Sequence, residues 1–200
     1  MKMRKDESLI ILQFLFLFAL PFLSKAQLTD DRIHDLKAGR VNPDTSYVYA
    51  LPFAANNKFL LIQAYNSKMS HAGELSLDFK MKKGTKICAA REGVVIATKK
   101  DSDRGGLKSE YMNDGNHIII RHADGSIAMY WHLQQNGVMI RNGDRVIKGE
   151  HIGYSGNTGY SAFPHLHFQV QDANGSDIAT RFKLKKRVKY LRPGKWYKAS

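Results

Sequence analysis

Residues 161–170 read SAFPHLHFQV and carry two histidines, His165 and His167, within an otherwise apolar run. Side chains of a strand alternate between its two faces, so residues i and i+2 point the same way, with their roots roughly 6.5–7 Å apart. Two imidazoles on one face are costly to bury without partners. The pair therefore lies either at a wet surface or at a site where the rings converge on a metal ion or on a transferred proton.

The sequence around this pair has the pattern of an all-β protein. From residue 46 onward, short segments rich in Val, Ile, Tyr and Phe are separated by turn residues, and no long amphipathic helix pattern is present. Asp124-Gly125 is a strong hairpin signal. Two polar stretches, 101–115 and 155–164, read as long loops of the kind that build substrate grooves on a rigid scaffold. The expected strand segments are 47–53, 58–65, 75–81, 87–100 (two strands hinged at 92–93), 116–122, 127–133, 146–155 and 165–171.

Residues 1–26 have the pattern of a secretory signal peptide. The first eight residues, MKMRKDES, carry a small net positive charge. They are followed by the apolar stretch LIILQFLFLFALPFL and by Ser24-Lys25-Ala26, which supplies small residues for cleavage by a signal peptidase. A retained membrane anchor is the alternative, but the apolar run is shorter than the roughly 20 residues of a spanning helix, and Pro21 interrupts it. The sequence therefore predicts export to the periplasm, the cell envelope or the medium.

The chain is strongly basic. Its net charge is +13, and the first 26 residues carry four basic and two acidic side chains, so cleavage lowers the charge by 2 to +11. Residues 180–200 hold nine Lys or Arg and no acid, which fits a final strand with a basic solvent face or a surface that docks on a polyanion. The single cysteine, Cys88, excludes an intramolecular disulfide and is expected in a buried strand.

Two further histidines, His71 and His132, fit a zinc site together with the pair at 165 and 167. His71 in SHAGELSLDF and His132 in YWHL lie at expected strand ends or loop edges, and Asp78 follows His71. A hydrolytic zinc site uses three protein ligands and leaves the fourth position to water, so one histidine of the pair with His71 and Asp78 completes the count. The metal lowers the pKa of that water to about 7, and histidine is suited to moving its proton. An H-x-H spacing alone is a weak signal, and the surface alternative stays open.

Four segments, taken in order, resemble a known family. They are SHAGELSLDF, GTKICAAREGVV, GNHIIIRHADGSIAMYWHL and NGDRVIKGEHIGYSGNTGYSAFPHLHF. The series is similar to the lysostaphin-type zinc metallopeptidases, the peptidoglycan endopeptidase family, over about residues 46–171. The resemblance implies a compact antiparallel β sandwich or barrel-like domain whose site lies in a groove walled by long loops. This expectation agrees with the all-β pattern.

The resemblance also implies the site residues, position by position. His71, Asp78 and His167 match the ligands of one zinc ion per chain, and no other cofactor is expected. His132 and His165 match the two catalytic histidines.

The chain departs from the family at the aspartate. The commonest spacing puts the aspartate four residues after the first histidine, where this chain has Leu75. Asp78 lies seven residues after His71, and Glu74 is the rival ligand. We favour Asp78 because LSLDF alternates as a strand and because the Asp-Phe pair keeps its family context.

The implied function is that of a secreted zinc metalloendopeptidase that hydrolyses stem or cross-bridge peptides of bacterial peptidoglycan. The alternatives are a non-catalytic wall-binding activator of other hydrolases and a protease that acts on exported proteins. Expected partners are wall peptides and anionic envelope polymers, with no specific nucleic acid and no transmembrane span after signal cleavage. The expected division is a signal peptide (1–26), a leader (27–45), a catalytic domain (46–171) and a basic C-terminal strand or extension (172–200).

Overall fold

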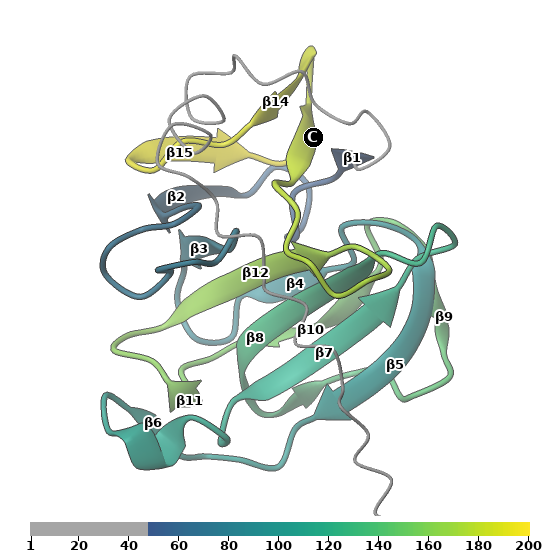
Figure 1. Cartoon of the computed structure of the whole chain (residues 1–200). Coiled ribbons are helices and arrows are strands. Elements are labelled where there is room, and N and C mark those ends of the chain that lie inside the picture. The colour runs from purple at the N-terminus through teal and green to yellow at the C-terminus, as the bar shows by residue number, and fades with distance from the viewer. Residues whose placement is uncertain (1–47) are drawn as a thin grey trace, which may run out of the picture.

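The computed structural model describes residues 48–200, which form short strands and one 3-10 turn (Figure 1). The predicted all-β class is confirmed for this part of the chain. The elements are β1 (Val48–Tyr49), β2 (Lys58–Gln63), β3 (Leu77–Lys80), β4 (Lys86–Cys88), β5 (Gly93–Lys99), β6 (Gly105–Gly106), η1 (Ser109–Tyr111), β7 (Asn116–Arg121), β8 (Ile127–Val138), β9 (Arg145–Val146), β10 (His151–Ser155), β11 (Gly159–Tyr160), β12 (His165–Gln171), β13 (Arg181–Leu184), β14 (Arg187–Tyr190) and β15 (Lys195–Lys198).

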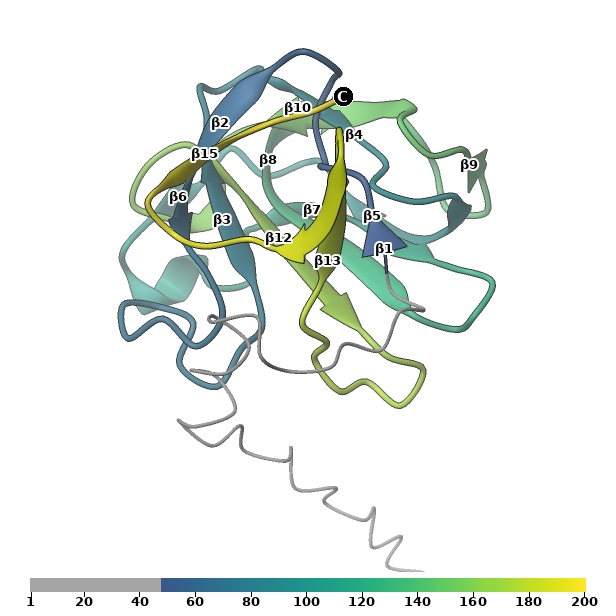
Figure 2. The same ribbon diagram turned by 90° about the horizontal axis from the view of Figure 1, so that it is seen from above.

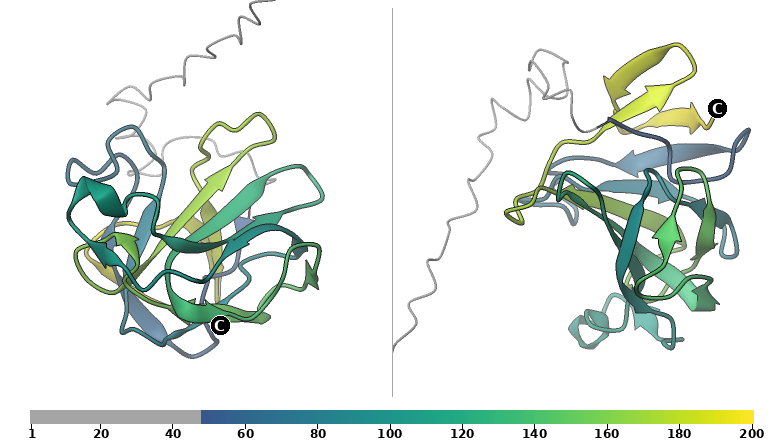
Figure 3. Two further views of the ribbon diagram at one scale, coloured as in Figure 1. Left: turned by 90° about the horizontal axis from the view of Figure 1, so that it is seen from below. Right: turned by 90° about the vertical axis from the view of Figure 1, so that its right-hand side faces the viewer.

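Most of these strands belong to one ten-stranded antiparallel sheet. Its order is β15-β2-β3-β12-β8-β7-β5-β9, and β10 joins it by pairing with both β4 and β8. A smaller sheet, β1-β13-β14, lies beside one end of the large sheet; from above, β1, β13 and β15 lie nearest the viewer (Figure 2). The two-residue pairings β1–β13 and β6–β11 are parallel. The arrangement is sheet on sheet, as the side view also shows (Figure 3).

The core is formed by the large sheet, including β4 and β10, together with residues of the small sheet. Alternate residues of the central strands point into it, and Tyr130, Phe168 and Phe182 are each fully buried. The ring centroids of Tyr130 and Phe168 lie 5.2 Å apart, and those of Phe168 and Phe182 lie 5.9 Å apart, in edge-to-face or tilted contact. Burying each such side chain stabilises the fold by about 1.5–3 kcal/mol. Because one face of β12 and β8 is committed to this core, the opposite face of the same strands is left for polar residues.

Several predicted elements are confirmed and others need correction. The strand at 165–171, the hinge between β4 and β5, the burial of Cys88 and the hairpin turn at Asp124-Gly125 all match the structure. The first predicted strand, 47–53, is reduced to β1, and 146–155 splits into β9 and β10. The C-terminal segment forms three strands rather than one, and β15 joins the large sheet. Pairing of β15 with β2 depends on residues more than a hundred positions apart, so local pattern does not reveal it.

The two predicted long loops contact each other through a pair of short strands. β6 lies in 101–115, β11 lies in 155–164, and the two strands pair. Gly159 has φ +78°, and a Cβ there would come within 2.7 Å of the Gly115 backbone, so the close approach requires glycine. The predicted signal peptide (1–26) and the predicted leader (27–45) lie outside the described residues, which begin at residue 48. Within 48–200, no helix has the length and apolarity needed to cross a membrane.

Candidate metal centre

Strands β3 and β12 bring three of the candidate residues onto one face of the sheet. Antiparallel pairing places His167 opposite Asp78 and His165 opposite Lys80. Directly opposed residues on neighbouring strands point to the same face. The apolar residues between them, such as Leu166 and Phe79, are fully buried in the core on the other face. The alternation of the SAFPHLHFQV segment therefore directs both histidines away from the core.

His71 comes from the loop between β2 and β3. The loop is held by turns, in which His71 N donates to Ser67 O at 3.1 Å and Glu74 N donates to His71 O at 2.9 Å. Gly73, with φ +80°, closes the second turn and donates its N–H to the side chain of Asn66. The commonest family spacing places the aspartate four residues after the histidine, and here it is seven residues after. This turn accommodates the extra residues. It leaves His71 beside Asp78.

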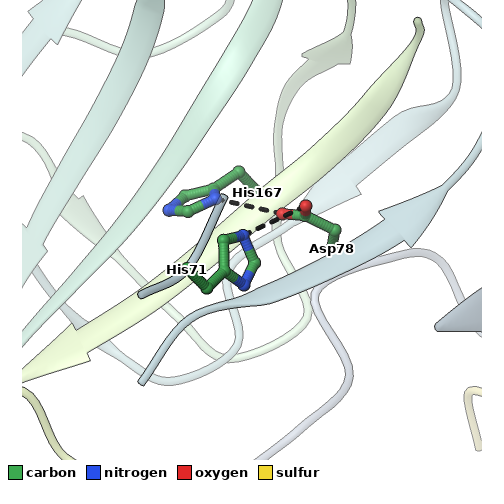
Figure 4. Close-up of side chains that lie close together, drawn as sticks. All are labelled: His71, Asp78 and His167. Carbon is green, nitrogen blue, oxygen red and sulfur yellow. Dashed lines mark hydrogen bonds and ion pairs between the residues drawn. The ribbon is translucent and has the colours of Figure 1, made fainter. Parts of the chain in front are cut away.

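The three side chains form a compact cluster (Figure 4). His71 Nε2 lies 3.1 Å from Asp78 Oδ2, and His167 Nδ1 lies 3.0 Å from Asp78 Oδ1. One ligand atom from each residue lies within 4.8 Å of the others, so the cluster is able to hold a metal ion. Neither ring nitrogen of the buried His71 makes a well-aligned hydrogen bond within the described chain. Buried nitrogens without partners are costly, and a bound cation would satisfy one of them.

Glu74 is placed differently. Its carboxylate accepts a hydrogen bond from Ser76 Oγ at 3.2 Å, and it is not part of the cluster formed by residues 48–200. Leu75 is buried in the core. The geometry thus brings Asp78, rather than Glu74, to the two histidines.

Asp78 is buried and surrounded by donors. Burial alone would raise its pKa, but the His167 and His71 rings outweigh burial and hold the pKa well below its ordinary value. For His71, burial lowers the pKa, and the neighbouring Asp78 more than offsets that effect and raises it. Gln63, at the end of β2, donates a hydrogen bond of 2.8 Å to Asp78 Oδ2. The carboxylate is therefore ionised and fixed in orientation.

His132 reaches the same face through an irregularity of β8. Asn116 pairs with Leu133 and His117 pairs with Trp131, so His132 has no partner across the β7–β8 ladder. Its φ is +64°, in the left-handed region that non-glycine residues seldom adopt. Such a bulge redirects a side chain. The His132 ring lies 4.6 Å from that of His165 and 5.8 Å from that of His167, centroid to centroid.

Hydrogen bonds fix the protons of two histidine rings. His132 Nδ1 donates to Thr158 O at 2.8 Å, and His165 Nδ1 donates to Phe163 O at 2.8 Å. A carbonyl only accepts, so each Nδ1 carries a proton and each neutral Nε2 keeps a lone pair. Burial, helped by His165 and His167, lowers the pKa of His132 to about 3, and burial also lowers the pKa of His165. Both rings are therefore neutral at pH 7, with Nε2 unprotonated.

All five predicted site residues lie together, and two further residues support them. The sequence predicts only a strand at Gln63, and the signal for its role is a polar side chain at the end of the apolar run FLLIQ. Thr158 was read as loop; its Oγ1 accepts from Asn116 N at 2.9 Å and donates to Leu133 O at 2.7 Å. Thr158 thereby ties the 155–164 loop to the bulge of β8. Nothing in its local sequence indicates that contact.

Comparison with known proteins agrees with this arrangement. Residues 72–180, more than half of the chain, match Peptidase family M23. The chain belongs to peptidase family M23. The M23 match begins at the residue after His71 and includes β3 through β12. It therefore contains Asp78, His132, His165 and His167. The predicted resemblance to lysostaphin-type metallopeptidases is thus confirmed.

Individual relatives are moderately similar over part of their length. An uncharacterised metalloprotease of Buchnera aphidicola is 37% identical over 114 residues, 57% of this chain and 26% of that protein. The peptidoglycan DD-endopeptidase ShyA of Vibrio cholerae is 32% identical over 93 residues, 46% of this chain and 19% of that protein. The chain thus spans about a quarter or less of these relatives. The solved structure of lysostaphin from Staphylococcus simulans superposes with a TM-score of 0.50 at 29% identity, covering 64% of this chain and 50% of that one.

Proposed function

We propose that this M23 chain is a zinc metalloendopeptidase that hydrolyses peptide bonds of bacterial peptidoglycan. The observation that carries the proposal is the convergence of His71, Asp78 and His167 beside two histidines, His132 and His165, whose Nδ1 atoms are each held by a backbone carbonyl. The names of two relatives, a peptidoglycan DD-endopeptidase and lysostaphin, support the choice of substrate.

We assign His71, Asp78 and His167 as the zinc ligands. Two imidazoles and one carboxylate are a donor set that zinc favours, and three protein ligands leave one position open for catalysis. The contact of His71 Nε2 with Asp78, the lack of a well-aligned hydrogen bond at either His71 ring nitrogen and the ionised state of Asp78 fit this assignment. A bound zinc ion would supply a coordinated water of pKa about 7 and would polarise the scissile carbonyl.

His132 and His165 act as the proton-transfer groups. Nε2 of one ring accepts a proton from the attacking water. The other ring, once its Nε2 is protonated, stabilises the oxyanion or gives that proton to the leaving amine, and the proton taken from water replaces the one given up. Because Nδ1 of each ring is held by a backbone carbonyl, each imidazole keeps the same tautomer and orientation through the cycle. Proton transfer of this kind contributes about 10²–10⁴-fold to rate.

We also propose that the protein is exported and that its basic surface binds anionic polymers. Export to the periplasm, envelope or medium follows from the signal-peptide pattern of residues 1–26 and from a substrate that lies outside the cytoplasm. The exposed lysines and arginines of β13, β14 and β15 offer a basic surface to anionic envelope polymers.

Digestion of purified sacculi by the chain from residue 27 onward tests the proposal. We expect about one zinc ion per chain by metal analysis, release of peptide-linked fragments identified by mass spectrometry, and loss of both after treatment with a chelator. Retained zinc with no released fragment would contradict hydrolysis and favour the wall-binding activator. Cleavage of exported proteins, with intact sacculi, would favour the alternative protease.

A further inference from the structure

A row of paired side chains runs from the cluster to the edge of the large sheet. Backbone pairing aligns His165 with Lys80, Lys80 with Leu60, and Leu60 with Trp196. Opposed residues of antiparallel strands share a face, so all four side chains lie on the face that carries the cluster. Neighbouring strands lie 4.7–4.9 Å apart, and the row is therefore about 14 Å long. Strands β12, β3, β2 and β15 lie side by side in this order (Figure 1).

This row faces solvent. Lys80 is exposed, Leu60 is half-buried, and Trp196 leaves 58% of its surface exposed at the far end. On the opposite face of the same strands, Leu61 and Phe79 are fully buried. The exposed indole of Trp196 and the half-buried Leu60 form an apolar strip with Lys58 and Lys80 beside it, a combination that suits contact with a ligand.

Lysines accompany an aromatic ring at each end of the row. Lys58 Nζ lies 5.7 Å from the Trp196 ring, and Lys80 Nζ lies 5.9 Å from the ring of Phe163. Phe163 is 39% exposed, and its ring centroid lies 5.6 Å from that of His165. Within β2, β3 and β15 there are four lysines, and Asp78, buried in the cluster, is the one acid. The exposed charge along the row is therefore positive.

We propose that Lys58, Leu60, Lys80 and Trp196, the Trp196 shelf, bind an extended acidic peptide segment of the substrate on one side of the scissile bond. The inference rests on the proposed function. An extended peptide advances about 3.3 Å per residue, so a segment leaving His165 reaches Trp196 about four residues away. Its carboxylates meet the lysines, and its apolar parts cover Leu60 and the indole. The shelf is one row wide and continuous with His165, which suits a single peptide chain.

Three of the four shelf residues lie outside the M23 match, and Lys80 lies inside it. β2 and β15 lie outside residues 72–180. β15 comes from the basic segment that follows the matched region, and its antiparallel pairing with β2 carries Trp196 to the cluster face. The shelf therefore determines which substrates are preferred, while the cluster performs the chemistry.

Fluorogenic peptides of two lengths test the shelf. Short peptides carry two residues on each side of the scissile bond, and long ones add glutamate at the fourth residue on one side or the other. For the wild type we expect one of the two glutamate placements to raise kcat/KM about tenfold over an alanine peptide of equal length. Lys58→Glu and Trp196→Ala should each abolish that gain and leave the short peptide unaffected, and Lys58→Glu should instead prefer lysine at the fourth residue.

Matched variants are Lys148→Glu, an exposed lysine in the turn before β10, and Met139→Ala, whose side chain is as exposed as Trp196 at 58%. Neither should change the preference for glutamate. Equal losses on short and long peptides, or no effect of glutamate in either placement, would overturn the shelf.

A binding measurement separates failure of the shelf from failure of the proposed function. Trp131 and Trp196 are the two tryptophans of the chain, so Trp131→Phe isolates the fluorescence of Trp196. We expect the long glutamate peptide to change this fluorescence with at least tenfold higher affinity than the alanine peptide, whether or not cleavage occurs. Binding with no cleavage of any peptide would contradict the hydrolase and keep the shelf. Equal affinity for inorganic polyphosphate and the glutamate peptide would overturn the shelf in favour of a nonspecific polyanion surface.

Discussion

Strands β12 and β8 lie side by side and bring histidines to the same face by different means. In β12, regular alternation directs His165 and His167 outward and their neighbours inward. In β8, His132 reaches that face only because the ladder with β7 skips it and its φ is positive. In the regular strand, the direction of each side chain follows from the local alternation of the sequence. Hydrogen bonds with Thr158, in the 155–164 loop, stabilise the left-handed backbone conformation of His132. An isolated non-glycine residue seldom adopts this conformation.

Removing a ligand from the regular strand should have the largest effect. His167→Ala deletes one of the three proposed donors, so we expect zinc content below about a tenth of an ion per chain and no measurable turnover. Metal analysis and sacculus digestion measure the two effects. Gln169→Ala, the next outward residue of β12, is the matched control and should keep both zinc and activity. Full zinc occupancy in His167→Ala would show that β12 does not supply a ligand.

Removing the bulged histidine should separate chemistry from metal binding. His132→Ala is expected to retain zinc and to lower kcat by about 10²–10⁴-fold, because a proton-transfer group is lost while the donors remain. Metal content and kcat are measured on the same preparation. If zinc leaves together with activity, the two strands do not divide the roles as we propose.

Loosening the bulge itself should have an intermediate effect. Thr158→Val removes the hydroxyl that bridges Asn116 N and Leu133 O. Leu133 O keeps the hydrogen bond from Asn116 Nδ2 at 3.3 Å, but the buried Asn116 N–H loses its acceptor, which costs about 1–3 kcal/mol of unfolding free energy. We also expect a drop in kcat larger than any rise in KM, since the substrate-facing surface is unchanged. Denaturant melts and steady-state kinetics measure these.

The control for the bulge variant is Thr98→Val, whose exposed hydroxyl bonds Asn142 at 3.1 Å. It should change stability by less than about 0.5 kcal/mol, as surface substitutions usually do. Equal effects of the two variants would mean that Thr158 does not support the bulge.

The smallest effect is expected at the hairpin that fixes the register of β7 against β8. Burial raises the pKa of Asp124, but hydrogen bonds from Ser126 and Arg91 outweigh it and lower the pKa to about 2. A depressed folded-state pKa stabilises the fold above the unfolded value near 3.9, and the contribution is lost as pH falls from about 4 to about 2.

Asp124→Asn should therefore be less stable than the wild type at pH 7, by about 0.5 kcal/mol, because Asp124 keeps contact with solvent, with 30% of its side chain exposed. The difference should shrink toward pH 2 in thermal melts. A difference that does not depend on pH would mean that the ionised carboxylate is not what holds the turn.

Much of this molecule follows from local sequence pattern. The outward-facing His165 and His167, the hairpin at Asp124-Gly125 and the buried Cys88 were all predicted. Each depends on alternation or turn chemistry within a few residues. The resemblance to a family then indicated His71, Asp78 and His132, although spacing alone left Glu74 as a rival.

Other features could not be predicted because they depend on contacts between distant segments. Gln63 orients Asp78 through a side-chain hydrogen bond across 15 positions, and a register shift between β2 and β3 brings the two together. The pairing of β15 with β2 turns a basic tail into an edge of the cluster face. Hydrogen bonding across a sheet has no preference for particular side chains, so register and partner choice are settled by the packing of the whole domain.

The sequence by itself determined the all-β class and the shared face of His165 and His167, because side-chain direction in a strand is a local property of the backbone. Only the tertiary structure decided that Asp78 rather than Glu74 meets the histidines, that a left-handed residue turns His132 toward them, and that Trp196 ends on their face. These outcomes depend on register between strands far apart in the chain, and the packed core selects that register.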